Sequence, residues 1–459
     1  MRTLVVIDDE PVIREMLVRH LEAQGWRVFE ADNGDEGIAL VGTHRPVAVL
    51  CDLLMPGTNG FNVCRAIRAR GDELGNITII VTTGSSFPAD RQNALEAGAT
   101  HYLVKPVSPK EIAAILASVQ ARPCDCDCDC SSENAAPRPV RSEADSARVR
   151  FWGVRGSIAT PGPDTVRYGG NTTCVEVRVG EDIVVLDAGT GIRLLGEELR
   201  REFSGRQVKA HLLLTHTHWD HIQGLPFFGP IHDPGSCITV LGYEGARQSL
   251  LKTLSAQMDS AVFPVGLDQV AGGLTVRELH GLEFRAGRVP VQAIFTHHPG
   301  ITLGYRLSTP GGGVVFMPDT EVLPYPRPRP GKTTPPGATA NEDTQNFNTY
   351  KNQLLAEFAQ GAELFICDAQ YTAEEYEGRI GWGHSCIDDT VHLALQARVK
   401  HLILFHHDPT HNDDAIDRIV EHAREIVART GGSLRVDAAA EGMEIVLHRK
   451  PRTPAPAPV

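Results

Sequence analysis

The chain has 459 residues, more than one typical domain holds, so we expect two or three domains. Hydrophobic residues make up 42% of it and charged residues 22%, a balance typical of globular proteins. The formal net charge of −13 argues against a long nucleic acid as the partner, because its phosphates require a basic surface.

The N-terminal text "MRTLVVIDDE" lacks the pattern of a secretion signal, and no apolar run approaches the roughly 18 residues of a membrane helix. We therefore expect a cytoplasmic protein with no membrane partner. Thiols stay reduced in that compartment, so the ten cysteines do not predict a disulfide framework.

Over residues 1–122, short apolar segments that end in polar residues alternate with segments of helical periodicity. The strand-like segments include "TLVVIDD", "VAVLCDLLMP", "ITIIVTTG" and "HYLVKPV", and "EPVIREMLVRHLEAQGW" is the first predicted helix. Such alternation predicts a parallel sheet covered by helices on both faces. Ligands bind sheets of this kind at the carboxyl ends of the strands.

Polar side chains that could bind a cation and a phosphoryl group stand at those strand ends. Neighbouring carboxylates repel each other unless a cation neutralises them, and Mg²⁺ accepts a few carboxylates together with waters and phosphate oxygens. A lysine and a hydroxyl beside them could recognise a phosphoryl group on Asp52. The residues are Asp8, Asp9, Asp52, Thr82 and Lys105.

The composition changes at residues 123–148, where apolar periodicity almost disappears and the sequence predicts a linker. This segment contains "CDCDCDC", from Cys124 to Cys130. Its thiols could share one side of an extended chain and bind a soft metal or act as a redox latch. The alternative is a flexible linker without such a role.

A second α/β region is expected over residues 149–450, with predicted strands at "TTCVEVRVGEDIVVLDAGTG", "QVKAHLLLTHTH", "GVVFMPD", "AELFICDA" and "KHLILFHHD". A Pro-rich insertion at residues 324–346 interrupts this region, and loops of this length are usually functional or disordered. Residues 451–459 are expected to form a disordered tail.

The segment "LLLTHTHWDHIQG" carries three histidines and an aspartate directly after an apolar run. Imidazole and carboxylate ligands suit zinc, with manganese and iron as alternatives. One ion rarely accepts four ligands from so tight a loop, so we expect two ions, which at about 3.5–4 Å apart act as a clamp in hydrolysis. The candidate ligands are His216, His218, Asp220 and His221.

Two ions need further ligands, and other predicted strand ends offer them. An aspartate can bridge two ions through its two oxygens. Asp187 in "VVLDAGTG" more plausibly orients a histidine by accepting a hydrogen bond from it. The further candidates are His297 or His298 in "FTHHPG", Asp319 in "VVFMPDT", and His406 or His407 in "LILFHHDP".

The text "VVIDDE", "LCDLLMPGTNGF", "IIVTTG" and "HYLVKPV" resembles the response-regulator receiver family, whose fold is a flavodoxin-like (βα)5 domain. The resemblance implies Asp52 as the phosphoacceptor, a sensor histidine kinase as the partner, and Tyr102 as the switch aromatic. A homodimer through the last helices of the receiver is a further expectation. The implied magnesium and phosphate site is Asp8, Asp9, Asp52, Thr82 and Lys105.

The text "IVVLDAGTG", "LLLTHTHWDH", "FMPDT" and "LILFHH" resembles the metallo-β-lactamase superfamily, whose fold is an αββα sandwich. The resemblance implies that Asp319 bridges two divalent metals. His298 is preferred to His297 because "HPGITLGYRL" resembles the phosphodiesterase branch, and His406 is preferred to His407 because it ends the strand. The implied ligands are His216, His218 and His298 for one metal, and Asp220, His221 and His406 for the other.

The ligand set also bears on the reaction. True zinc β-lactamases commonly use a cysteine where Asp319 stands, so the set resembles the phosphodiesterase and RNase Z branches instead. His384 in "GWGHSCIDD" resembles the histidine of these branches that contacts the scissile phosphate or protonates the leaving group, and Ser385 is expected to cap the next helix. The expected substrate is a small phosphodiester such as a cyclic nucleotide, with His384 and Asp220 as catalytic residues.

Two alternatives for the function stay open. The same metal ligands could serve a thioester or lactone hydrolase, and the region could instead bind a nucleotide or a partner without turnover. For His384 the alternative is a loop histidine that binds a helix N-terminus. We also expect Arg155 or Asn171 to line the pocket, and Trp219 to pack its loop rather than to stack on a substrate base.

Overall fold

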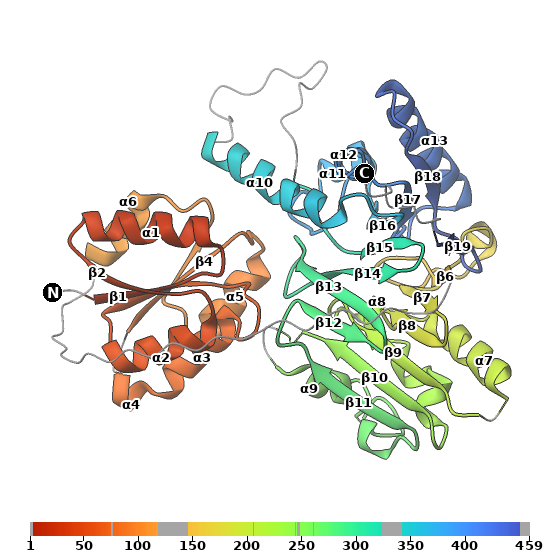
Figure 1. The fold of residues 1–459 in the computed structure, drawn as a ribbon, viewed down its shortest axis with the longest axis horizontal. Helices are drawn as coiled ribbons and strands as arrows, with labels where there is room; N and C mark the ends of the chain where they lie inside the picture. The colour runs from red at the N-terminus through yellow and green to blue at the C-terminus, as the bar shows by residue number, and fades with distance from the viewer. Residues whose placement is uncertain are drawn as a thin grey trace, which may run out of the picture.

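The computed structural model describes residues 3–74, 77–117, 146–204, 206–243, 245, 248–259, 261–323 and 342–449. These residues form two α/β lobes that lie side by side (Figure 1). We call residues 3–117 the N-terminal lobe and residues 146–449 the C-terminal lobe. None of the helices in the described ranges is long and apolar enough to span a membrane.

The N-terminal lobe is a five-stranded parallel sheet in the order β2-β1-β3-β4-β5, which confirms the predicted (βα)5 fold. The central strand β3 is buried at every position, as its continuous apolar sequence predicts for a strand covered on both faces. The strands are β1 (Thr3–Ile7), β2 (Arg27–Ala31), β3 (Ala48–Asp52), β4 (Thr78–Thr83) and β5 (His101–Val104). The helices are α1 (Pro11–Ala23), α2 (Gly34–His44), α3 (Gly60–Ala69), α4 (Gly71–Leu74), α5 (Pro88–Glu96) and α6 (Pro109–Ala117).

The C-terminal lobe contains two seven-stranded sheets that pack face to face, as expected for an αββα sandwich. The first sheet has the order β11-β10-β9-β8-β7-β6-β19, with β6 (Ser146–Gly153), β7 (Cys174–Val179), β8 (Asp182–Leu186), β9 (Lys209–Leu213), β10 (Cys237–Gly242), β11 (Gly273–Glu278) and β19 (Glu444–His448). The second has the order β12-β13-β14-β15-β16-β17-β18, with β12 (Glu283–Ala286), β13 (Val289–Phe295), β14 (Leu303–Thr309), β15 (Gly312–Met317), β16 (Leu364–Asp368), β17 (His401–Phe405) and β18 (Arg435–Ala438).

Helices cover the outer face of each sheet. On α7, Ile192, Leu195 and Leu199 recur at helical spacing and pack into the core beside the first sheet, and α9 contributes Leu250 and Leu254 to the same core. Helices α10, α12 and α13 pack against the second sheet. The helices are α7 (Ile192–Phe203), α8 (Trp219–Ile222), α9 (Leu250–Ala256), α10 (Glu342–Ala359), α11 (Ala373–Tyr376), α12 (Ile387–Gln396) and α13 (Asp413–Arg429), with 3₁₀ turns η1 (Pro163–Thr165), η2 (Leu225–Phe227), η3 (Gly229–His232) and η4 (Leu267–Gln269).

The structure differs from two predicted segment boundaries. Strand β6 begins at Ser146, inside the segment predicted as linker, because its first residues pair with β7 and β19. Helix α10 begins at Glu342, inside the predicted Pro-rich insertion. The "CDCDCDC" segment and the predicted tail lie outside the described residues.

Candidate functional site

The carboxyl ends of strands from both sheets of the C-terminal lobe meet at one edge, and the predicted metal ligands follow those ends. Strand β9 leads into the loop of His216 and His218 and then into α8, which carries Asp220 and His221. Strands β13, β15 and β17 lead to His298, Asp319 and His406. Residues from distant parts of the sequence therefore converge on a single site.

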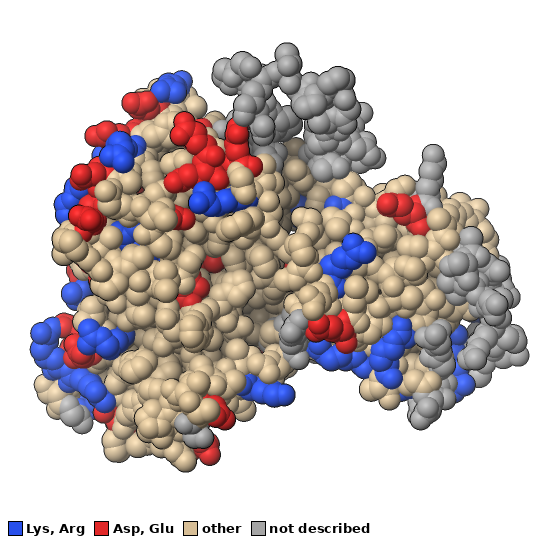
Figure 2. Space-filling view, turned by 180° about the vertical axis from the view of Figure 1, so that it is seen from behind, with Lys and Arg blue, Asp and Glu red and all other residues tan. Residues whose placement is uncertain are grey.

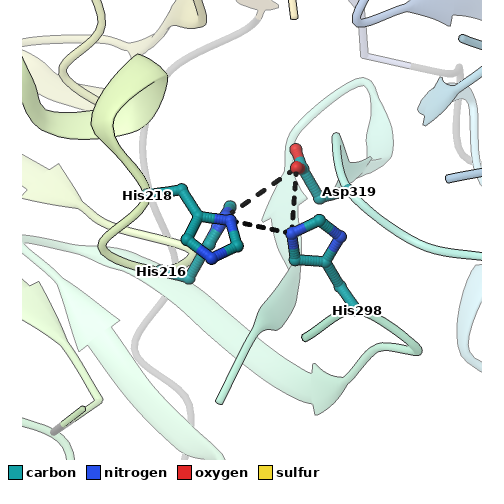
Figure 3. A group of neighbouring side chains, drawn as sticks. All are labelled: His216, His218, His298 and Asp319. Carbon is teal, nitrogen blue, oxygen red and sulfur yellow. Dashed lines mark hydrogen bonds and ion pairs between the residues drawn. The ribbon is translucent and has the colours of Figure 1, made fainter. Parts of the chain in front are cut away.

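The first group consists of His216, His218, His298 and Asp319, whose side chains point toward one another (Figure 3). His298 Nε2 lies 2.9 Å from His218 Nδ1 and 3.5 Å from Asp319 Oδ2. His216 Nε2 lies 3.8 Å from the same carboxylate oxygen. His218 is exposed whereas the other three are buried, so the group is open to solvent on the His218 side.

The second group consists of Asp220, His221 and His406, and all three are buried. His406 Nε2 lies 3.1 Å from Asp220 Oδ2 and 3.3 Å from Asp319 Oδ1. His221 Nε2 lies 3.0 Å from Asp319 Oδ1. Asp319 therefore stands between the groups, with Oδ2 toward the first and Oδ1 toward the second, as a carboxylate shared by two ions would.

The unsatisfied atoms of the site fit metal ions. His216 Nε2, His221 Nε2 and Asp319 Oδ1 are buried and, among the described residues, make no hydrogen bond of good geometry, although the last two atoms lie 3.0 Å apart. Burying such atoms is costly unless an ion or water occupies the space between them. Burial and neighbouring histidines hold the pKa values of His216 and His298 well below the ordinary value. Both rings are therefore neutral, the form in which histidine binds metals.

Hydrogen bonds from behind fix three of the rings. The Nδ1 of His221 donates to Asp187 over 2.8 Å, that of His298 donates to the carbonyl of Gly383 over 2.8 Å, and that of His406 donates to Gln370 over 3.0 Å. Each bond leaves Nε2 as the free lone pair toward the ligand group. Gly383 has a φ of 87°, and a Cβ there would lie 2.6 Å from His298 Nδ1, so a larger residue would displace this ring.

His384 lies beside both groups and forms a further set of possible metal ligands with Asp319 and His406. Its ring centroid is 4.9 Å from that of His298 and 4.9 Å from that of His406, and its Nδ1 donates to Asp368 Oδ2 over 2.8 Å. Burial disfavours the charged ring, but the Asp368 carboxylate outweighs it and raises the pKa of His384 to about 9. Asp368 ends β16, and it was not identified from the sequence although it follows an apolar strand as the other site residues do.

The two alternative histidines, over which His298 and His406 are preferred, lie outside the ligand groups, and Ser385 differs from its predicted role. His297 Nδ1 faces the Glu321 carbonyl at 3.3 Å, and His407 Nε2 donates to the Ala439 carbonyl over 2.9 Å, so neither joins the ligand groups. Ser385 does not cap α12, whose N-cap is Cys386, but donates to the Thr320 carbonyl beside Asp319.

The structure also places Arg155, Asn171 and Trp219 differently from the expectation that they line or pack the pocket. Arg155 is fully buried and donates to the backbone carbonyls of Gly169 and His411, while Asn171 pairs with Glu441. The side chain of Trp219 is 73% exposed, so the expectation that it packs its loop is wrong.

The N-terminal lobe brings the predicted phosphoacceptor site together at its strand ends. Lys105 Nζ lies 2.8 Å from Asp8 Oδ2 and 2.9 Å from Asp52 Oδ2, and Thr82 is paired with Asp52 across β3 and β4. Burial and the Asp52 charge raise the pKa of Asp8 to about 6 and that of Asp9 to about 7. A bound cation would relieve this concentration of negative charge.

The oxygens nearest to one another at this site belong to Asp8, Asp52 and Glu10, and Asp9 is not part of that trio. Glu10 was not identified from the sequence. It hydrogen-bonds to Tyr350 over 2.8 Å and pairs with Lys351 over 3.0 Å, and both partners lie on α10 of the C-terminal lobe. No pattern in the sequence near Glu10 predicts a contact with residues more than three hundred positions away.

Comparisons with known proteins match the two lobes separately. Transcriptional regulatory protein ResD of Bacillus subtilis is 42% identical over 109 residues, which are 24% of this chain and 44% of that protein. The chain spans about half the length of the curated relatives it matches. Among solved structures, the metallo-beta-lactamase fold protein YhfI of Bacillus subtilis aligns over 66% of this chain and 100% of its own at 17% identity, with a TM-score of 0.44. Human tRNase Z, short form, aligns over 65% of this chain and 99% of its own at 18% identity, with a TM-score of 0.42.

Family descriptions give the same division. The response regulator receiver domain matches residues 4–117, and the metallo-beta-lactamase superfamily matches residues 167–369. The chain thus joins a response regulator receiver domain to a domain of the metallo-β-lactamase superfamily.

Proposed function

We propose that the chain is a response regulator whose output is a dinuclear-metal hydrolase that cleaves a small phosphodiester, such as a cyclic nucleotide. The observation that carries the proposal is the His384–Asp368 pair beside two groups of metal-binding side chains that share Asp319. The ligand groups support hydrolysis in general, and the buried histidine–carboxylate pair supports a reaction whose leaving group needs a proton.

His216, His218 and His298 would hold one ion, Asp220, His221 and His406 the other, and Asp319 both. Two divalent ions there, with zinc as the preferred metal, would supply an activated water and positive charge against the phosphoryl oxygens. Asp220 is additionally held by the backbone N–H of Ser157 at 2.8 Å, which orients its carboxylate within the site.

His384 is suited to donate a proton to the leaving oxygen. Its Nδ1 is committed to Asp368, so Nε2 is the nitrogen that can reach a substrate, and the Asp368 carboxylate raises the pKa of His384 and so favours the protonated ring. Cleavage of a P–O bond expels an alkoxide that needs this proton. A thiolate expelled from a thioester needs it much less, which is why the phosphodiester is favoured.

A small substrate is supported by the surface around the site. Trp219, directly after the exposed ligand His218, and Trp382, two residues before His384, are 73% and 59% exposed, and either offers an aromatic face to a nucleobase. On the face shown in Figure 2, Lys and Arg occur in small groups among acidic residues rather than in an extended basic stripe. Together with the formal net charge of −13, this favours a small molecule over a long nucleic acid.

The N-terminal lobe would control the hydrolase through phosphorylation of Asp52 by a sensor histidine kinase, with Mg²⁺ at the neighbouring acids. Phosphorylation replaces the Asp52 carboxylate, which carries one negative charge, by an acyl phosphate that carries roughly −1.5 to −2 charges at neutral pH and three more oxygens, and this changes the balance between Lys105 and the acids around it.

The metal assignment predicts that the purified chain holds about two divalent ions, the number expected for a dinuclear hydrolase. Asp319→Ala should lose at least one ion and reduce hydrolysis of bis(p-nitrophenyl) phosphate to background, because its carboxylate is shared by both groups. Elemental analysis and a colorimetric assay measure the two effects. His422→Ala, which changes an exposed histidine on α13, is the matched control and should retain both properties. Unchanged turnover by metal-stripped protein would refute the assignment.

Replacement of His384 should depend on the leaving group. His384→Ala is expected to slow cleavage of a diester with an alkyl leaving group by roughly 10²–10⁴-fold, the usual contribution of a general acid. The loss on bis(p-nitrophenyl) phosphate should be much smaller, because p-nitrophenolate leaves without a proton. Steady-state kinetics at matched metal content make the comparison. An equal loss on both diesters would contradict the role, and thioester turnover that exceeds diester turnover and survives His384→Ala would favour the alternative thioester hydrolase.

Removal of the Asp368 charge should change the pH profile. In Asp368→Asn the pKa of His384 falls, so the protonated ring is lost at a lower pH and the alkaline limb of kcat/KM for an alkyl diester moves to lower pH. Bound metal ions oppose the imidazolium in both proteins alike, so the difference between the two profiles reports the Asp368 charge. Thermal unfolding checks that the variant is folded, and coincident alkaline limbs would argue against the pair.

Asp52→Asn should abolish labelling of the chain by acetyl phosphate and Mg²⁺ while leaving the C-terminal lobe intact. Phosphate-affinity electrophoresis follows the labelling, and the diester assay is run with and without acetyl phosphate. Wild-type turnover should change on labelling, whereas the variant's turnover should not. A response of equal size in Asp52→Asn would show that another residue is the phosphoacceptor.

A further inference from the structure

A hydrogen bond joins the N-terminal lobe to the loop that carries a proposed metal ligand. The backbone N–H of Gly300 donates to Asp90 Oδ1 over 2.9 Å. Gly300 lies two residues after His298, and Asp90 lies on α5 with 1% of its surface exposed. A buried carboxylate of one lobe is therefore satisfied partly by the metal-binding loop of the other.

The loop of residues 297–300 is held at His297, whose carbonyl accepts from the N–H of Glu321 over 2.7 Å. Its base is closed by the N–H of Thr296, which donates to the Thr302 carbonyl over 2.9 Å, and the His298 ring is held by the Gly383 carbonyl. Gly300 has a φ of 83°, a conformation that favours glycine and that lets its N–H meet Asp90. The contact with Asp90 thus fixes the tip of the loop. It thereby also restrains the backbone that positions the His298 side chain.

The other oxygen of Asp90 leads toward the phosphoacceptor. Ser85 Oγ donates to Asp90 Oδ2, and the Ser85 carbonyl accepts a hydrogen bond from Tyr102 over 2.9 Å. The Ser85 N–H donates to Thr83 Oγ1 over 3.1 Å, one residue after Thr82, which is paired with Asp52. Residues 83–87 therefore connect the end of β4 to the side chain that holds Gly300.

A cavity of about 400 Å³ between the lobes brings these parts together. Asp52, Lys105 and Ser85 line it from the N-terminal lobe, and His298 and Lys351 line it from the C-terminal lobe. A phosphoryl group on Asp52 would enter this space, beside the residues that carry Asp90 and beside the Lys351–Glu10 ion pair. Its charge would act at short range on the Asp90–Gly300 hydrogen bond and on the Lys351–Glu10 ion pair.

We propose that Asp90 is a positioning residue for the loop of residues 297–300. The hydrogen bond from Gly300 to Asp90 lets the N-terminal lobe fix the position of His298. A phosphoryl group on Asp52 then changes how tightly the metal at His298 is bound. This inference rests on the proposed metal role of His298, but not on any particular substrate. The link is short, because Asp90 accepts a hydrogen bond from Ser85 with one oxygen and from Gly300 with the other.

The test measures the rate at which the zinc-loaded full chain releases zinc to a colorimetric chelator, a readout that does not involve hydrolysis. Asp90→Ala should release the ion held by His298 roughly tenfold faster or more. This is the size of effect expected when a hydrogen bond to a charged group is lost. Asp90→Asn should stay near the wild-type rate, because its amide oxygen can accept from Gly300 and its amide nitrogen can donate to Ser85. Arg91→Ala, an exposed neighbour on the same helix, is the matched control.

The second arm repeats the measurement after acetyl phosphate and Mg²⁺. The wild-type release rate should change severalfold, and Asp90→Ala should lose that change although electrophoresis shows full labelling of Asp52. Ser85→Ala keeps the Asp90–Gly300 bond but removes the link toward the phosphoacceptor. It should therefore keep the basal rate and lose the response, which separates the contact from a general loss of folding.

The outcomes separate the two proposals. A wild-type chain that binds no zinc overturns both of them. Tight zinc binding with identical release rates in wild type and Asp90→Ala overturns this inference alone, as does a wild-type rate that labelling leaves unchanged. Failure to hydrolyse any diester, with the release rates as expected, overturns the proposed reaction and leaves the positioning role supported.

Discussion

The C-terminal lobe is organised around the buried carboxylate of Asp319. Burying a charge is costly unless other charges or hydrogen bonds compensate for it, and here histidines from three different strand ends provide the compensation. Although burial opposes ionisation, His221 and His406 hold the pKa of Asp319 well below its ordinary value. Because each oxygen faces a different group, the position of this one side chain determines whether the two groups act as a pair.

The backbone around Asp319 is fixed by residues that also serve His384. Thr296 Oγ1 donates to the Asp319 carbonyl over 2.9 Å, and Ser385 Oγ donates to the carbonyl of Thr320. Asp368 accepts from the N–H of Thr320 with the oxygen that also accepts from His384. The Asp319 carboxylate and the proposed proton donor therefore share a support, so their separation is set by a few rigid contacts rather than by flexible side chains.

The sequence predicted the fold class and the residues that follow strand ends, because apolar strands and the polar residues after them are local patterns. The same reasoning missed Asp368, Gln370 and Glu10, since their contacts join segments that only the folded chain brings together. Local patterns misplaced Trp219 and Ser385 for a related reason. The direction in which a loop side chain points depends on neighbours from other strands, as the Thr320 contact of Ser385 illustrates.

Coupling between the lobes, if carried by Asp90, must act in both directions. If a phosphoryl group on Asp52 changes the affinity for metal at His298 by some factor, the bound metal must change the stability of the phosphorylated state by the same factor. The reason is that both equilibria share one coupling free energy. The contact is suited to such an exchange, since one Asp90 oxygen accepts a hydrogen bond from Ser85 and the other accepts one from Gly300. The metal content of the C-terminal lobe would then set how readily the N-terminal lobe retains its phosphoryl group, and the output site would act back on the receiver that controls it.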